Sequence, residues 1–268
     1  KLAEEVSLPV MVCMDGFILT HAVEQVDVPE EEKVQRFLPP FEPRVLLDPE
    51  NPISIGAMVG PEAFTEVKYL AHHKQMQALE LIPQVQKEFQ EIFGRDSGGL
   101  LHEYRCEDAE TIILCLGSVT GTVRDVVDSR RKAGEKIGVV SLVSFRPFPR
   151  VAVRRALKHA RTVVVLEKAF SVGIGGIVAS GVRTALMDYE IDHYELIAGL
   201  GGRDITQESI NRYLDEVKAG TMKRFKFLDL NRELVDRELE RERQVRRSGS
   251  IPENMIKDVT SMMTEATR

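Results

Sequence analysis

Three side chains near the start of the chain have the types and spacing that acid–base chemistry requires. Asp15, His21 and Glu24 follow the apolar run at residues 8–14, which predicts a strand. Carboxylates and imidazoles act as general acids and bases, and an aspartate between a strand and a glycine is well placed to bind a ligand. An aspartate there also forms tight turns. The group is no self-sufficient catalytic set, so the sequence assigns no catalytic residue.

Glycine-containing loops form a second group of candidates. These loops are Gly117-Ser118, Arg146-Pro147-Phe148-Pro149, Gly173–Gly176 and Gly199–Asp204. Glycine lets a backbone approach a ligand closely, and the N-terminus of a following helix attracts anions. The same glycines also make tight strand-to-helix turns. Arg203 and Asp204 can anchor an anion, or Asp204 can cap the helix that follows it.

None of these loops carries a complete nucleotide-binding fingerprint. The pattern Gly-x-Gly-x-x-Gly lacks its second glycine at Gly117 and its third at Gly173. The chain also contains no P-loop and no Gly-x-Ser-x-Gly nucleophile elbow. An independent nucleotide-binding enzyme is therefore a weak interpretation of this sequence.

The cysteines predict neither a metal site nor a disulfide framework. Cys13, Cys106 and Cys115 lie far apart, and no Cys-x-x-Cys pair occurs. Zinc knuckles and iron–sulfur runs need such pairs, so we predict no metal ligand in this chain. An odd cysteine count without a secretory signal is typical of the reducing cytoplasm, where we expect the protein.

Composition narrows the function classes further. The 268 residues include 36 Lys and Arg against 42 Asp and Glu, for a net charge of −6, which argues against a broad nucleic-acid surface. No apolar run approaches the ~18 residues of a membrane span. Because the first residue is Lys1, we expect an internal piece, a cleaved product or a chain without its true start.

Four strand–helix units position the glycine-containing loops. Apolar runs predict strands at residues 111–116, 137–143, 162–166 and 194–198, each followed by a helical stretch. Runs that are apolar throughout are typical of a parallel sheet covered on both faces. The loops after parallel strands share one edge of the sheet, where open α/β sheets bind ligands. The expected fold class is α/β, with a doubly wound parallel sheet.

Two segments precede this sheet. Residues 27–60 are rich in proline, which disfavours a helix and predicts an extended segment docked on a surface. Residues 61–93 predict a long amphipathic helix that Pro83 kinks and Gly94 ends.

A tail follows the sheet at residues 221–268. Residues 232–247 are almost all charged and predict an exposed helix. Residues 250–265 begin with a capping box and carry an apolar stripe, which packs on the chain's own domain or contacts a partner.

Several segments together resemble the alpha subunit of 2-oxoacid:ferredoxin oxidoreductases. Asp15-Gly16-Phe17 followed by Thr20-His21 is similar to an Asp-Gly-Phe…Ser/Thr-His stretch of that family. Residues 112–118, 146–149 and 199–206 resemble segments of the subunit's second domain in the same order. The resemblance covers residues 6–220, and the pyruvate branch of the family is the most similar.

The resemblance implies a division of the chain. Residues 1–26 would be the end of the pyrimidine-binding thiamin diphosphate domain, and residues 27–108 a connection with the long helix. Residues 109–220 would form an α/β domain like the C-terminal domain of transketolase. Residues 221–268 would be a helical tail beyond the usual end of that domain.

The resemblance also implies cofactors and partners. Asp15, Gly16, Phe17, Thr20 and His21 would lie near the cleft for thiamin and substrate. Thiamin diphosphate, Mg²⁺ and 4Fe-4S clusters would be bound mostly by other chains. The partners would be a beta subunit with the diphosphate-binding domain, gamma and ferredoxin-like delta subunits, and ferredoxin or flavodoxin.

The implied reaction converts a 2-oxoacid, coenzyme A and oxidised ferredoxin to acyl-CoA, CO₂ and reduced ferredoxin. Pyruvate is the leading substrate, although enzymes that act on 2-oxoglutarate, branched-chain and aromatic 2-oxoacids and oxalate share the scaffold. The alternative is a non-catalytic, transketolase-C-like module that serves assembly or docking within a larger complex.

Overall fold

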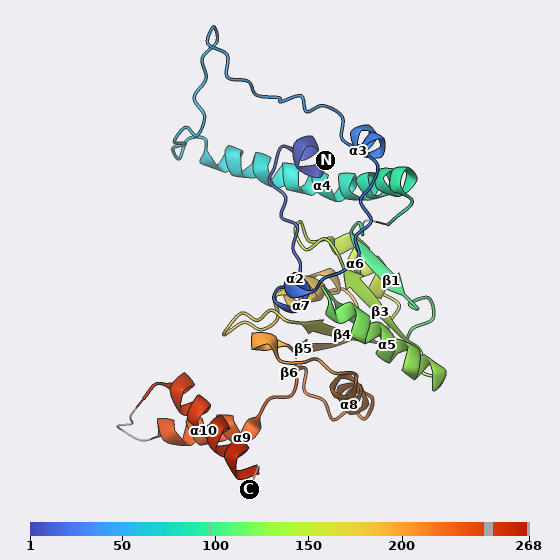
Figure 1. Cartoon of the computed structure of the whole chain (residues 1–268), viewed down its shortest axis with the longest axis vertical. Helices are drawn as coiled ribbons and strands as arrows, with labels where there is room; N and C mark the ends of the chain where they lie inside the picture. The colour runs from blue at the N-terminus through green and yellow to red at the C-terminus, as the bar shows by residue number, and fades with distance from the viewer. Residues whose placement is uncertain (97, 244–248, 267–268) are drawn as a thin grey trace. The chain divides into compact units, whose positions relative to one another are not determined.

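A computed structural model describes residues 1–96, 98–243 and 249–266 (Figure 1). The chain divides into two compact units, Lys1–Lys226 and Phe227–Arg268. The first unit contains a group of helices near the N-terminus and a sheet flanked by helices. The second unit contains two helices.

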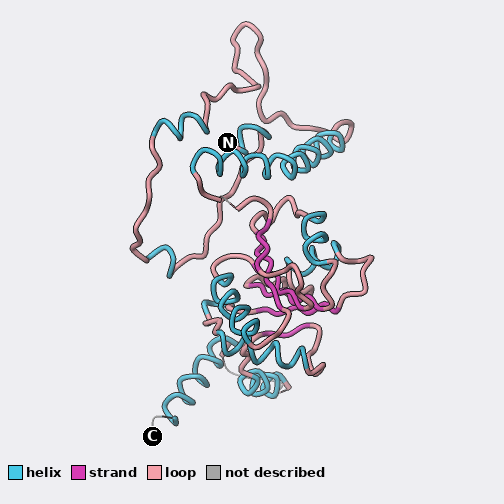
Figure 2. Tube along the Cα trace, turned by 90° about the vertical axis from the view of Figure 1, so that its right-hand side faces the viewer, coloured by secondary structure: helices cyan, strands magenta, loops and turns pink. Residues whose placement is uncertain are grey.

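The first unit is built on one six-stranded sheet, whose strands are magenta in Figure 2. Its order is β1-β3-β2-β4-β5-β6. The strands are β1 (Leu101–Tyr104), β2 (Thr111–Cys115), β3 (Ile137–Leu142), β4 (Thr162–Glu167), β5 (Asp192–Ile197) and β6 (Phe225–Phe227). Strand β2 is parallel to both β3 and β4, β4 is parallel to β5, and β1 pairs antiparallel with β3. The predicted parallel sheet is confirmed, and its four predicted strands form the centre.

Helices cover both faces of this sheet. They are α5 (Val119–Lys132), α6 (Arg150–Leu157), α7 (Ile177–Ala185) and α8 (Gln207–Lys218). Helix α5 contacts α8, and α6 contacts α7. Ile112, Leu114 and Val163 share one buried cluster with residues of α6 and α7. Ile113 and Val164 are also buried and point to the other face by strand alternation. The doubly wound arrangement is therefore confirmed.

The winding of the chain reverses between β2 and β4. These strands are neighbours, but the helices that follow them, α5 and α7, belong to opposite faces. In open α/β sheets, such a reversal separates the two following loops and creates a crevice at the carboxyl ends of the strands. The carboxyl ends of β2 and β4 are therefore the place where this fold can form a ligand-binding site.

Two of the three short N-terminal helices pack against one long helix. The short helices are α1 (Leu2–Val6), α2 (Ile18–His21) and α3 (Glu31–Phe37), and the long helix is α4 (Phe64–Phe93). Helices α1 and α3 contact α4, and the Phe37 ring lies 5.4 Å from that of Phe89. The long helix predicted at residues 61–93 is confirmed; it includes Pro83, and Gly94 ends it in the left-handed region at φ 68°.

Two expectations for the N-terminal part are wrong. The run at residues 8–14 forms no strand in the described structure, and Met11 and Val12 are 86% and 89% exposed. An apolar run becomes a strand only where a second strand satisfies its backbone groups, and none lies beside this one. Helix α3 also falls within the proline-rich segment, because residues 31–37 lie between Pro29 and Pro39.

The second unit is a pair of helices, α9 (Arg232–Glu242) and α10 (Ile251–Ala266), which contact each other. Arg241 donates two hydrogen bonds to the Asp258 carboxylate, at 2.7 and 2.8 Å. Both predicted tail helices are present, while residues 244–247 of the first prediction lie outside the described residues.

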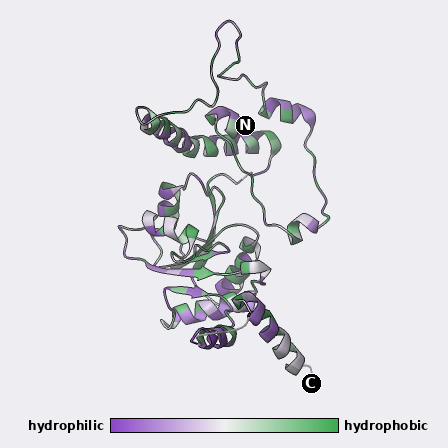
Figure 3. Ribbon diagram, turned by 90° about the vertical axis from the view of Figure 1, so that its left-hand side faces the viewer, coloured by the Kyte–Doolittle hydropathy of each residue, from purple (hydrophilic) through white to green (hydrophobic). Residues whose placement is uncertain are grey.

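The described helices are amphipathic or short. Figure 3 shows both hydrophilic purple and hydrophobic green along α4, the longest of them. Across residues 1–96, 98–243 and 249–266, no helix has the length and apolar content that crossing a membrane requires.

Candidate functional site

The carboxylate of Asp15 lies at the carboxyl end of the sheet, where the winding reverses. The backbone N–H of Ser118, after β2, donates to Asp15 Oδ2 at 2.6 Å. Lys168 Nζ, after β4, lies 3.3 Å from Asp15 Oδ1 and donates to Ser118 Oγ at 3.1 Å. The loops after β2 and β4, the strands on the two sides of the reversal, thus each supply a group that contacts Asp15. We call the triangle of Asp15, Ser118 and Lys168 the Asp15 latch.

The start of α5 explains why a carboxylate is stable at this point. Ser118 precedes the helix, so its N–H is one of the donors that an α-helix leaves without an internal partner. The helix dipole also favours negative charge there. Hydrogen bonds from the side chain and backbone of Ser118, assisted by Lys168, hold the pKa of Asp15 below its usual value despite partial burial. Asp15 is therefore a stable anion in the latch.

Gly117 provides the space for this contact. Its φ of +79° lies in the left-handed region, and a Cβ there would stand 3.0 Å from Asp15 Oδ2. A side chain at this position would crowd the carboxylate and strain the backbone. This position therefore requires glycine for the turn and for the approach of Asp15.

Lys168 is held in place by its neighbours. The carbonyl of Glu167 accepts a hydrogen bond from the N–H of Ala198 at 3.0 Å, which fixes the backbone beside Lys168 to β5. Gly199 has a φ of +70°, and a Cβ there would lie 3.4 Å from Lys168 Cγ. The lysine stem therefore runs past a position without a side chain. The loops after β2 and β4 meet at Asp15, and the loop after β5 lies beside Lys168, as parallel strands predict.

The glycine-rich loop before α7 is filled by the chain's own carboxylates. Glu167 is 2% exposed and accepts the N–H groups of Val178 and Ala179 at 2.8 and 3.0 Å. Burial raises the pKa of Glu167, while these hydrogen bonds oppose the shift. Glu195, paired with Arg183, accepts the N–H of Gly176 at 3.4 Å. Anion binding by this loop is therefore not supported, since its donors are already used.

The prediction that Asp204 caps the following helix is wrong. The cap of α8 is Thr206, whose Oγ1 accepts the N–H of Ser209 at 3.1 Å. Asp204 is exposed and lies two residues before that cap. Threonine satisfies the helix donor directly, so Asp204 is not needed for capping.

The other candidates near Asp15 form a compact turn of their own. His21 Nδ1 lies 2.6 Å from the Phe17 carbonyl oxygen, and Thr20 Oγ1 donates to the same oxygen at 3.2 Å. The rings of Phe17 and His21 are 5.0 Å apart, and Phe17 is 78% exposed. Gly16 is also exposed and has open space around it. Glu24 is exposed and takes no part in the latch.

Two family models match parts of this chain. A family model described as "Pyruvate:ferredoxin oxidoreductase core domain II" matches residues 109–210. A model described as "Pyruvate flavodoxin/ferredoxin oxidoreductase, thiamine diP-bdg" matches residues 1–87. The chain belongs to the 2-oxoacid:ferredoxin oxidoreductase family.

Relatives in this family are named as subunits. The pyruvate synthase subunit PorA of Methanosarcina barkeri is 42% identical over 251 residues, covering 88% of this chain and 61% of the relative. PorA of Methanothermobacter thermautotrophicus is 43% identical, covering 77% and 53%. The ketoisovalerate oxidoreductase subunit VorA of Pyrococcus horikoshii is 36% identical, covering 81% and 56%. The chain spans 53 to 61% of the length of these relatives.

The described residues suit contact with the organic ring of the family's thiamin diphosphate better than they suit binding of its diphosphate. The N-termini of α5 and α7, which would suit a diphosphate, hold Asp15 and Glu167 instead. Among the described residues, no group of three or more His, Cys, Asp or Glu side chains could hold a metal ion. The exposed rings of Phe17 and His21, by contrast, suit contact with an organic ring. The described residues therefore present exposed rings that an organic cofactor could contact, and they do not fit a diphosphate–metal site.

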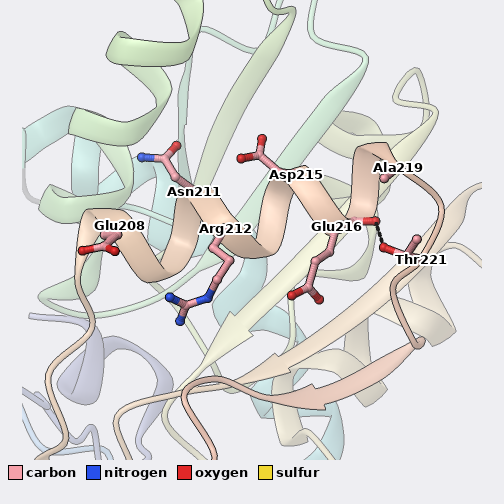
Figure 4. Close-up of a pocket in the computed structure, with 7 residues that line it drawn as sticks. All are labelled: Glu208, Asn211, Arg212, Asp215, Glu216, Ala219 and Thr221. Atoms are coloured by element: carbon pink, nitrogen blue, oxygen red, sulfur yellow. Dashed lines mark hydrogen bonds between the residues drawn. The ribbon is translucent and has the colours of Figure 1, made fainter.

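A groove along α8 is unrelated to this site (Figure 4). Its lining residues are Glu208, Asn211, Arg212, Asp215, Glu216, Ala219 and Thr221. Arg130 of α5 donates to the side chains of Asn211 and Asp215, both at 2.7 Å. Thr221 Oγ1 donates to the Glu216 carbonyl at 3.2 Å. These contacts tie α8 to its surroundings, and they account for the polar lining without a ligand.

Proposed function

We propose that this chain is part of the alpha subunit of a thiamin diphosphate-dependent 2-oxoacid:ferredoxin oxidoreductase, with pyruvate as the leading substrate. The carrying observation is the Asp15 latch. It joins the Asp-Gly-Phe stretch to the loop after β2, so two segments that resemble the family meet through Asp15 and Ser118. The PorA relatives support pyruvate, and VorA shows that the scaffold also occurs in an enzyme named for another 2-oxoacid.

The proposed reaction is oxidative decarboxylation. A 2-oxoacid and coenzyme A yield acyl-CoA and CO₂, and the two electrons released pass to ferredoxin or flavodoxin. Thiamin diphosphate, when bound, supplies the electron sink that this decarboxylation needs. Phe17, Thr20 and His21 would line the cleft for its ring and for the substrate, while the Asp15 latch fixes that wall to the sheet.

Other chains would supply the remaining parts. A beta subunit would bind the diphosphate and Mg²⁺, gamma and ferredoxin-like delta subunits would complete the assembly, and 4Fe-4S clusters would carry the electrons. We keep the proposed division of this chain at residues 1–26, 27–108, 109–220 and 221–268. The expected location remains the cytoplasm.

The decisive test is thiamin-dependent activity of the assembled enzyme. The complex that contains this chain is purified and assayed for 2-oxoacid-dependent reduction of a viologen dye with coenzyme A. Pyruvate should give the highest kcat/KM, with 2-oxoglutarate and 2-oxoisovalerate as competing substrates. A complex that reduces the dye equally well after removal of thiamin diphosphate would contradict the proposal.

A second candidate is a non-catalytic assembly module, favoured by one observation. The N-termini of α5 and α7 already hold the chain's own carboxylates, so the sheet edge has few donors left for a small anion. This function predicts that the isolated chain binds partner subunits but neither coenzyme A nor thiamin diphosphate. Calorimetry that detects tight binding of either ligand to the isolated chain would exclude it.

A further inference from the structure

The segment before α3 depends on one side chain for its polar contacts with the sheet. Within described residues 9–29, the hydrogen bonds of Thr20 and His21 return to Phe17 in the same turn. The polar contacts that reach the sheet all end on Asp15. The position of this segment against the sheet is therefore controlled through the Asp15 carboxylate.

Fixing Asp15 also orients the exposed rings that follow it. Phe17 lies two residues after Asp15 and has a left-handed φ of 58°, which turns the chain back on itself. The carbonyl of Phe17 is hydrogen-bonded by both Thr20 and His21. Residues 15–21 thus form one small unit, and a displacement of the Asp15 carboxylate moves both rings.

The partner side of the latch is rigid. The Lys168 backbone follows Glu167, whose carboxylate and carbonyl are bonded to α7 and to Ala198. Ser118 is the N-cap of a 14-residue helix. The segment that contains Asp15 is thus held at a fixed point of the sheet.

The ion pair in the latch adds little to folding. The side chains of Asp15 and Lys168 are 28% and 35% exposed, and ion pairs this accessible contribute little to stability. Lys168 also bonds Ser118 Oγ, so it fixes the geometry of two groups at once. This arrangement suits orientation better than it suits stabilisation.

We propose that Lys168 and Ser118 are positioning residues, which act through Asp15 to hold Phe17 and His21 in the orientation that the cofactor cleft requires. This inference rests on the proposed function, since it names the residues that position the same site. Neither residue touches the cofactor in this scheme. Lys168 supplies a charge and a hydrogen-bond donor, and Ser118 supplies its backbone N–H and its hydroxyl.

The test compares Lys168→Met, Lys168→Arg and Asp15→Asn in the assembled complex. Lys168→Met should raise deuterium uptake in residues 9–21 several-fold and lower kcat/KM for the 2-oxoacid about tenfold. Lys168→Arg should keep deuterium uptake and kcat/KM close to their wild-type values, because arginine keeps the charge and the donors. The matched control is Lys158→Met, which removes an exposed lysine at the end of α6.

A double variant separates positioning from general loosening. If Lys168 acts through Asp15, adding Lys168→Met to Asp15→Asn should cause little further change in either readout. Additive losses would overturn the proposal, and so would deuterium uptake in residues 9–21 that stays unchanged in Lys168→Met. The exchange measurement does not depend on catalysis. A wild-type complex without thiamin-dependent activity would instead overturn the proposed function alone.

Discussion

The Asp15 carboxylate takes the place that a bound anion takes in many α/β proteins. It accepts the N–H at the start of α5 and faces a lysine, which are the two kinds of group that bind phosphates. Here the anion is part of the chain and comes from 103 residues away in sequence. The fold thus uses its ligand-binding edge for an internal contact.

The pH dependence of stability should reveal this contact. The pKa of Asp15 is lowered in the folded chain, so the latch stabilises at pH values above the unfolded pKa. That stabilisation is lost as the pH falls through the folded pKa. The free energy of unfolding of wild type should exceed that of Asp15→Asn by about 1 kcal/mol at neutral pH. Denaturant unfolding between pH 2 and 7 measures the difference, which should vanish only at the acid end. A difference that grows on acidification would contradict the latch.

Gly117→Ala should weaken the latch by a steric route. An alanine there adopts an unfavourable φ, which costs about 1 kcal/mol, and its Cβ crowds Asp15 Oδ2. Gly134→Ala is the matched control, because Gly134 has a φ of +86° and open space around its Cβ position. Both variants should lose stability in urea unfolding, Gly117→Ala more than Gly134→Ala, but only Gly117→Ala should raise deuterium uptake in residues 9–21. Equal uptake in the two variants would show that Gly117 serves the turn alone.

The sequence indicates part of this site. Asp15 stands out because it precedes a glycine, and Gly117, Ser118 and Gly199 stand out because loops after parallel strands share an edge. Lys168 carries no such signal, since one lysine after an apolar strand is common on protein surfaces. The meeting of Asp15 with Ser118 also depends on the path of the long connection, which no local pattern specifies.

Buried carboxylates organise the connection from β4 to α7. Glu167 ends β4 and returns to cap α7, so one side chain satisfies the donors of a helix that begins ten residues later. Lys168 follows directly, and its backbone position depends on this cap. The element that carries the latch is thus held by a carboxylate that the sequence analysis did not select.

Glu167→Gln should destabilise this connection strongly. An amide presents one acceptor and one donor where the structure needs two acceptors, so a buried N–H group loses its partner at a cost of about 1–3 kcal/mol. Thermal unfolding should show a lower midpoint, and deuterium uptake should rise in residues 168–180. Glu107→Gln, which changes an exposed glutamate of the same domain, should alter neither. An unchanged midpoint in Glu167→Gln would mean that the cap is dispensable.

Regular elements are predictable where burial fixes the pattern. The strands β2, β3 and β4 are mostly apolar and the second half of β5 is buried, because helices cover both faces of the sheet. Strand β1 is missed, since Leu101-His102-Glu103-Tyr104 is short and mixed and is held by pairing with β3. The run at residues 8–14 has the composition of a strand without a neighbour to pair with. The composition of a segment therefore indicates well whether the segment is buried, and poorly whether it pairs with a neighbouring strand.

Apolar side chains remain uncovered over much of residues 10–60. Met11, Leu47 and Met58 are 86%, 75% and 99% exposed, and many apolar neighbours are exposed with them. An exposed apolar surface of this extent is typical of a site that contacts another protein. The expectation that the proline-rich segment docks on a surface is met in part within the chain, at α3, where the Phe37 ring packs against Phe89 of α4. The proposed assembly with other subunits would provide such a surface.

Charge substitutions in this segment should therefore weaken assembly without weakening the chain itself. Met11→Glu and Leu47→Glu place a charge where an apolar contact would form, and burying an unpaired charge costs several kcal/mol. Sedimentation of the complex should show loss of partner subunits, while the urea midpoint of the isolated chain stays unchanged. Val151→Glu, at a 78% exposed position on α6, is the control. If the two variants lower the urea midpoint of the isolated chain, these side chains pack within it; if all three disrupt assembly equally, the contact is not specific to residues 10–60.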